Sequence, residues 1–173
     1  GDVEDTTSDR NDHAGVFGRL DEIGGAQHAS VGVMPADQRL GPDDLALKIS
    51  EIREATGGMI PIQLKLGASR VYDDVRMAVK CDPDSIYIDG MEGGTGAGPH
   101  LATEDTGVPG MAAIRQARKA IDDLGKRGEI SLVYAGGIRN GADVAKAVAL
   151  GADAIAIGHS AMMALNCNKD IPE

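Results

Sequence analysis

The sequence predicts an α/β fold in which four parallel strands alternate with helices. Three observations support this prediction. Short apolar runs alternate with longer segments of helical periodicity, the apolar runs are nearly continuous, and the runs end in glycine. Strands that alternate with helices form parallel sheets with right-handed crossovers, and continuous apolar runs are typical of strands covered on both faces.

The first helix is predicted at residues 41–58, with Pro42 near its first position, Asp43 and Asp44 in its first turn, and Gly57 and Gly58 as its stop. Asn140 or Asp143 lies near the start of a later helix. In chain order after the first helix, the predicted elements are a strand at 60–67, a helix at 69–82, a strand at 85–90, a helix at 109–126, a strand at 129–137, a helix at 140–152, a strand at 153–158 and a helical piece at 161–165.

Two regions are expected in the chain. Residues 1–40 have a polar and loop-like composition and are expected to be irregular or disordered. Residues 41–173 carry the four predicted strand–helix units, whereas a complete (β/α)8 barrel needs roughly 200 to 250 residues. Half of a TIM-type barrel is therefore the favoured interpretation, and a small open doubly wound sheet is the alternative.

The composition excludes several classes of protein. The formal net charge of −10 argues against a nucleic-acid partner and against binding to an anionic membrane surface, which both require a basic face. No apolar run reaches the ~20 residues of a membrane-spanning helix. The acidic first residues do not resemble a signal peptide, and two distant cysteines make no disulfide framework. A cytoplasmic location is expected.

Glycine clusters follow the third and fourth predicted strands. In a parallel α/β fold these loops lie at the carboxyl end of the sheet, where ligands bind. Backbone N–H groups without Cβ hindrance near a helix start suit a phosphate. The predicted phosphate-site residues are Gly136, Gly137, Gly158 and His159. The alternative for either turn is tight packing between strand and helix.

A third glycine-rich stretch, "IDGMEGGTGAGP", follows the second predicted strand. Its bare backbone can approach a flat ring or a second ligand closely. The residues expected to do so are Gly93, Gly94, Thr95 and Gly96, and the nearby Asp89 and Glu92 offer hydrogen-bond acceptors. A flexible surface loop is the alternative.

Lys65 stands in the apolar strand "IQLKLG", near its carboxyl end. By alternation it shares a face with Gln63 and Gly67, and in a barrel this face lines the lumen. A lysine there is costly unless it meets an anion. Lys65 is therefore the candidate catalytic and ligand-binding residue, and a strand-end lysine that reaches water is the alternative.

With Lys65 and the glycine motifs in this order, the chain resembles the FMN-binding synthase domain of glutamate synthases. The similar segments are "GPDDLALKI", "PIQLKLG", "YIDGMEGGTGAGP", "GVPGMAAIR", "YAGGIRNGADVAKAVALGADAIAIG" and "ALNC", which together cover roughly residues 41–167. Among these proteins the resemblance is greatest to the large subunits that include N-methylglutamate synthase. It implies the C-terminal half of a (β/α)8 barrel with FMN at its carboxyl face.

The resemblance also implies an activity and its partners. Ammonia from a glutamine amidotransferase domain or subunit condenses with 2-oxoglutarate, and the iminium is reduced by the flavin to glutamate. The methylamine variant gives an N-substituted glutamate.

Positions matched to the family motifs imply roles for particular residues. Lys65 would lie beside the flavin and the keto-acid carboxylate, Gly93, Gly94, Thr95 and Gly96 would line the flavin ring, and Gly136, Gly137, Gly158 and His159 would hold its phosphate. Cys167 matches one ligand of the family's iron–sulfur cluster. One cysteine cannot hold a cluster, so none is expected in this chain.

Two alternatives to this function remain open. The chain is also consistent with another phosphate- or FMN-binding barrel, similar to IMP dehydrogenase or the 2-hydroxy-acid oxidases. The other alternative is a non-catalytic or truncated half-barrel that self-associates or needs a partner chain, since pairing would close the exposed sheet edges.

Overall fold

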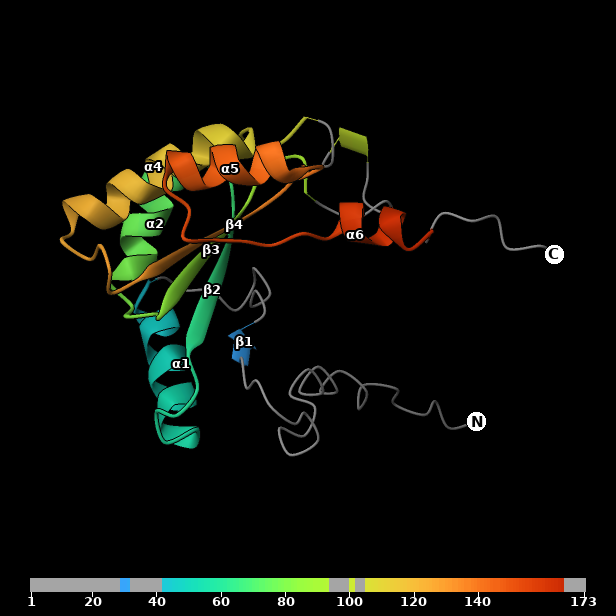
Figure 1. Ribbon diagram of the computed structural model, residues 1–173. Helices are drawn as coiled ribbons and strands as arrows, with labels where there is room; N and C mark the ends of the chain where they lie inside the picture. Colours follow the sequence, from blue (N-terminus) through green and yellow to red (C-terminus); the bar gives the residue numbers. More distant parts are fainter. Residues whose placement is uncertain (1–28, 32–41, 94–99, 102–104, 167–173) are drawn as a thin grey trace, which may run out of the picture.

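The computed structural model describes residues 29–31, 42–93, 100–101 and 105–166. Strands and helices alternate along the chain from β1 to α6 (Figure 1). The elements are β1 (Ala29–Val31), α1 (Pro42–Ala55), β2 (Ile62–Gly67), α2 (Val71–Val79), β3 (Ser85–Asp89), α4 (Gly110–Asp123), β4 (Ser131–Ala135), α5 (Gly141–Leu150), β5 (Ala154–Ile155) and α6 (His159–Ala164).

All neighbouring strands are parallel, and their order in the sheet is the order of the chain, β1-β2-β3-β4-β5. The helices α2, α4 and α5 lie together on one side of this sheet (Figure 1). Right-handed crossovers between sequential strands always place the helices on the same face, as in a barrel, whereas a doubly wound sheet reverses its order and has helices on both faces. The fold is therefore half of a (β/α)8-type barrel, and the open doubly wound alternative is wrong.

The sheet differs from the prediction at its two edges. The short strand β1 falls within residues 1–40, where no strand was expected, and it pairs with the start of β2. At the other edge, β5 contains two residues although a strand was predicted over 153–158. The chain makes one more sheet contact at Ala156, whose N–H donates to the Tyr134 carbonyl over 2.8 Å, and it turns into α6 soon afterwards.

The predicted signals for helix ends are confirmed. Asn140 is the N-cap of α5, and its side chain accepts hydrogen bonds from the N–H groups of Ala142 and Asp143. Helix α5 ends at Gly151, whose φ of 118° is a conformation that favours glycine. Helix α1 begins at Pro42 and is followed by the left-handed pair Gly57 and Gly58.

The hydrophobic core lies between the sheet and its helices. Alternate strand residues point into it, as the fully buried side chains of Ile62, Ile86 and Leu132 show. The helices contribute small and branched side chains, among them the predicted inward residues of α2, which are Val71, Val75, Ala78 and Val79. This helix layer packs against one face of the sheet and leaves the other face available to a ligand.

The opposite face of the sheet is polar and open. In the described part of the chain no helix packs on it, and its side chains include exposed Lys65 and the half-buried Gln63 and Tyr87. The pairing register places Lys65 beside Tyr87 and Gly67 beside Asp89. The predicted lumen face of β2 is thus the face on which Lys65 lies.

Two aspartates fasten the amino ends of the strands, and we call each with its arginine an amino-end clamp. Asp84 accepts the N–H of Ile62 over 2.6 Å and lies 3.2 Å from Arg53 of α1. Asp153 accepts the N–H of Leu132 over 2.7 Å and lies 2.5 Å from Arg118 of α4. Each aspartate stands just before one strand and binds the preceding strand, so each clamp fixes the register of a strand pair.

Candidate functional site

The candidate site is centred on Lys65 at the carboxyl end of β2. Its Nζ atom lies 2.8 Å from Oδ2 of Asp89, the last residue of β3. The same Nζ lies 5.1 Å from the centroid of the Tyr87 ring, within the range of a cation–π contact. Half of the Lys65 side chain remains exposed, at 50%, so its ammonium group is held in place and still accessible from the open face.

The start of the glycine-rich loop packs against the same carboxylate. A Cβ atom at Gly93 would overlap Oδ1 of Asp89, so a larger residue there would displace the carboxylate. Gly93 also donates its N–H to the Gly90 carbonyl over 2.9 Å, which closes a tight turn after β3. Asp89 therefore contacts both Lys65 and the loop that was predicted to approach a flat ring.

Glu92 joins this loop to the start of α4. Its carboxylate accepts the N–H of Gly110, with 3.0 Å to Oε2 and 3.3 Å to Oε1. A carboxylate at a helix N-terminus satisfies a free N–H group and complements the helix dipole. The acid predicted only as an available acceptor is therefore the anchor of α4.

A dense corner of glycines supports the loop after β4. The Tyr134 hydroxyl donates to the Gly136 carbonyl over 2.5 Å and leaves no room for a Cβ at Gly110. Gly136 has a φ of 116°, and a Cβ there would lie 3.0 Å from the Gly90 nitrogen. At Gly137, with a φ of 66°, a Cβ would lie 2.9 Å from Cβ of Glu92. The packing alternative thus accounts for why these two positions are glycine.

The predicted phosphate loops nevertheless lie together and offer donors. The Ser160 hydroxyl donates to the Ile138 carbonyl, which joins the loop after β4 to the start of α6. In the described part of the chain, the N–H groups of Gly137, Gly158 and His159 have no hydrogen-bond acceptor. A Cβ at Gly158 would meet open space. These groups suit an anion, since free backbone N–H groups at a helix start bind phosphate.

The site's environment shifts several pKa values. The hydrogen bond from Lys65 to Asp89 raises the lysine pKa, because the carboxylate favours the ammonium form. Burial raises the pKa of Tyr87. Burial, with the nearby carboxylates of Glu92 and Asp89, raises the pKa of Tyr134 to about 12. The site at neutral pH therefore holds a cationic lysine and neutral tyrosines.

The structure brings the predicted residues into two groups. Lys65 and Gly93 meet through Asp89, and the pair Gly136 and Gly137 adjoins Gly158 and His159 through Ser160. Gly94, Thr95 and Gly96 lie outside the described residues. Sequence reasoning missed the pairing of Lys65 with Asp89. The two residues lie on consecutive strands, β2 and β3, and the expected pairing of these strands was the signal that could have predicted their contact.

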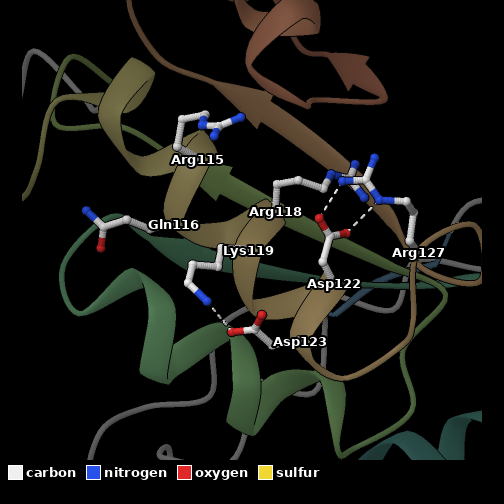
Figure 2. A pocket seen from close by; sticks show the side chains of 7 residues that line it. All are labelled: Arg115, Gln116, Arg118, Lys119, Asp122, Asp123 and Arg127. Atoms are coloured by element: carbon white, nitrogen blue, oxygen red, sulfur yellow. Dashed lines mark hydrogen bonds and ion pairs between the residues drawn. The ribbon is translucent and has the colours of Figure 1, made fainter.

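A groove of about 400 Å³ lies elsewhere, on the outer side of α4 (Figure 2). Many of its charged side chains pair with one another, as Figure 2 shows for Arg127 with Asp122 and for Lys119 with Asp123. Arg118, which also lines the groove, donates hydrogen bonds to Asp153 and to the Gly151 carbonyl. The groove is a surface feature of the helix layer and takes no part in the candidate site.

Within the described ranges, no cluster of three or more His, Cys, Asp or Glu side chains is arranged to hold a metal ion. Cys167 lies outside those ranges. Cys81 is buried, and burial raises the pKa of its thiol, as suits a core side chain. Among the helices that the structure describes, none combines the length and apolar character needed to cross a membrane.

Comparison with known families decides the relationship. Residues 35–170 match the family model described as the conserved region in glutamate synthase. The chain belongs to the glutamate synthase family. Four of the features discussed above, namely Lys65, the loop after β3 and the two loops after β4 and β5, fall inside the matched range.

Curated relatives agree with this membership. The chain is 51% identical over 128 residues to the glutamate synthase large subunit-like protein of Rhizobium meliloti, covering 74% of this chain and 29% of that one. It is 40% identical over 126 residues to the archaeal glutamate synthase [NADPH] of Methanocaldococcus jannaschii, covering 72% of this chain and 25% of that one. The chain thus spans between a quarter and a third of the length of these relatives.

A solved structure supports the barrel-type fold. The chain superposes on the L230A mutant of flavocytochrome b2 with benzoylformate with a TM-score of 0.53 at 20% identity, covering 70% of this chain and 28% of that one. At this identity the similarity shows the fold alone. The matched share fits a part of a larger barrel.

Proposed function

We propose that residues 41–173 form the FMN-binding C-terminal half-barrel of a glutamate-synthase-like oxidoreductase. The parent reaction is the reductive transfer of ammonia or methylamine to 2-oxoglutarate, which gives glutamate or an N-substituted glutamate. The observation that carries the proposal is an accessible lysine on the open face of a barrel sheet in a chain of this family. Family membership supports the reaction class, and the residues below support the cofactor.

The loops after β4 and β5 would hold the FMN phosphate. The free N–H groups of Gly137, Gly158 and His159 point to an anion, and the link from Ser160 to Ile138 keeps the two loops together. The loop after β3, with Gly93, Gly94, Thr95 and Gly96, would lie against the flavin ring. When bound, FMN supplies the hydride that reduces the iminium carbon.

Lys65 would bind the anionic part of the site. Its ammonium group is cationic at neutral pH, and the hydrogen bond to Asp89 raises its pKa further above that of an ordinary lysine. Half of its side chain is exposed toward the lumen. There it can bind the keto-acid carboxylate and stabilise negative charge on the reduced cofactor. The ring of Tyr87 lies beside the ammonium group and limits its movement on that side.

A second candidate is a half-barrel that acts only after a partner completes it. The open polar face of the sheet and the 25–29% coverage of longer relatives favour this candidate. The partner would be the rest of the barrel, a second copy of this chain or another subunit, and a glutamine amidotransferase unit would supply ammonia. A barrel similar to IMP dehydrogenase or the 2-hydroxy-acid oxidases shares the phosphate loops and is a weaker alternative.

The test is an FMN titration of the purified chain, combined with light scattering after size exclusion. We expect quenching of FMN fluorescence, and about a tenfold weaker affinity in Lys65→Met, the loss expected for one charge-assisted contact. Lys48→Met, on the outer helix α1, is the matched control and should bind as the wild type does. Absence of FMN binding in monomer and oligomer alike would contradict the cofactor proposal.

A further inference from the structure

Glu92 lies where three segments meet at the carboxyl end of the sheet. It belongs to the turn after β3, residues 90–93, and its carboxylate accepts the N–H of Gly110 at the start of α4, with 3.0 Å to Oε2 and 3.3 Å to Oε1. Its side-chain stem lies against the loop after β4, where a Cβ at Gly137 would be 2.9 Å from Cβ of Glu92. One side chain therefore contacts both a helix start and the loop of the next strand.

Backbone hydrogen bonds fix the first half of this turn. The N–H of Gly90 donates to the Ala135 carbonyl over 2.9 Å, and the N–H of Met91 donates to the Val108 carbonyl over 3.1 Å. The contacts of Glu92 extend this attachment to the second half of the turn, next to Gly93. The turn is thus attached to α4 and to the loop after β4 along its whole length.

We propose that Glu92 is a positioning residue, which aligns the two parts of the FMN site by holding the turn after β3 at a fixed distance from the loop after β4. The turn leads through Gly93 into the proposed flavin-ring loop, and Gly137 belongs to the proposed phosphate loop. One FMN molecule would bind both parts, so its affinity depends on their spacing. This inference rests on the proposed function, because it concerns the cofactor of that same site.

Electrostatics alone predicts the opposite effect of Glu92. A carboxylate beside the Gly137 loop repels a phosphate, and the N–H of Gly110 at the positive end of α4 offsets part of that charge. If Glu92 acted on the ligand only through its charge, its removal would tighten FMN binding. If Glu92 aligns the two loops, its removal weakens FMN binding although a negative charge is lost.

The test is fluorescence titration of the full chain with FMN, followed by displacement of FMN with inorganic phosphate. The variants are Glu92→Ala, Glu92→Gln and the control Glu51→Ala, an exposed glutamate of α1. We expect Glu92→Ala to bind FMN about tenfold more weakly, the loss expected when one hydrogen bond to a charged group no longer holds the alignment. Its affinity for inorganic phosphate should be at least that of the wild type, because phosphate needs only the loops after β4 and β5.

The conservative variant and the control separate alignment from charge. Glu92→Gln should bind FMN at least as tightly as the wild type, because its amide oxygen can still accept the N–H of Gly110. Glu51→Ala should leave both affinities unchanged. Circular dichroism checks that each variant is folded. If Glu92→Ala fails to fold, Glu92→Asp takes its place, since the shorter side chain keeps the charge and should weaken FMN binding in the same way.

Three outcomes would overturn the inference. They are unchanged or tighter FMN binding in Glu92→Ala, an equal weakening of FMN and phosphate in that variant, and a loss in Glu92→Gln as large as in Glu92→Ala. The wild type separates this inference from the proposed function. If the wild type binds no FMN, the proposed function fails and the inference falls with it. If the wild type binds FMN and Glu92→Ala behaves as the control does, only the inference fails.

Discussion

The two ends of the sheet use ionic groups in opposite ways. At the amino end, Arg118 is almost fully buried, with 6% of its side chain exposed, and it binds both Asp153 and the Gly151 carbonyl. At the carboxyl end, Lys65 makes a similar pair with Asp89 but keeps half of its side chain exposed. The guanidinium group of Arg118 is engaged in hydrogen bonds within the fold, whereas the ammonium group of Lys65 remains accessible to a ligand.

This difference separates stability from recognition within one sheet. In barrels, conserved groups at the amino end of the strands serve stability, and groups at the carboxyl end serve chemistry. The amino-end clamps and the Lys65 site follow the same division. Substitutions at the two ends should therefore change different measurements, the free energy of unfolding at one end and ligand affinity at the other.

The largest effect on stability is expected from Arg118→Met. The substitution keeps the packing of the side-chain stem and removes hydrogen bonds to Asp153 and Gly151, so the free energy of unfolding should fall by about 2–3 kcal/mol. Urea denaturation measures this change. The exposed Arg115 on the same helix provides the control, and Arg115→Met should change the value by less than about 0.5 kcal/mol. Equal effects of the two variants would remove the distinction between the ends.

The next effect is expected from Gly110→Ala. The new methyl group would overlap the Tyr134 hydroxyl, and such overpacking should cost about 1–3 kcal/mol of unfolding free energy. Gly141→Ala is the matched control at the first residue of α5, where a Cβ meets open space. That variant should be neutral or slightly stabilising in thermal unfolding. A harmless Gly110→Ala would show that the corner is loosely packed.

A smaller effect is expected from Tyr134→Phe, which removes the hydrogen bond to the Gly136 carbonyl and should cost about 1 kcal/mol at pH 7. Its pH dependence is the sharper test. The folded-state pKa of Tyr134 is raised to about 12, above the ordinary value near 10, so its contribution is complete below pH 10 and is lost as the pH rises toward 12.

Stability of the wild type should therefore fall more steeply between pH 10 and 12 than stability of Tyr134→Phe. Urea midpoints measured at several pH values for both proteins give this difference. Other groups titrate in the same range in both proteins, so they cancel in the comparison. Parallel profiles would contradict the assignment of the raised pKa to Tyr134.

The smallest effect on stability is expected from Lys65→Met. Its ion pair with Asp89 is half exposed, so the free energy of unfolding should change by less than about 0.5 kcal/mol. The same variant is expected to lose FMN affinity, as proposed above. Urea denaturation beside FMN titration would check this separation, and a large loss of stability would place Lys65 with the amino-end clamps.

The sequence was sufficient for the order of the elements from α1 onward and for the face on which Lys65 lies, although it did not predict β1. Both follow from short-range patterns, namely apolar runs, glycine stops and the alternation of side chains along a strand. The predicted cap at Asn140 is equally local, because its side chain binds N–H groups two and three residues away. These features were accessible because the interacting groups are close in the chain.

The clamps and the pairing of Lys65 with Asp89 were not predicted. Arg118 and Asp153 are 35 residues apart, and nothing in their local sequence identifies one as the partner of the other. The role of Glu92 depends on the position of the α4 N-terminus, which only the packed structure fixes. The two-residue β5 was overestimated because an edge strand has one neighbour to continue its pairing.

The amino-end clamps have a consequence for how such a barrel can evolve. One clamp fastens β2 to the residue before β3, and the other fastens β4 to the residue before β5. Each pair of strands therefore brings its own register, set by its own residues. A duplicated or recombined segment of this length would carry its alignment into a new protein, while the loops at the opposite end could diverge without disturbing it. The half-barrel is, in this sense, an assembly of transferable modules.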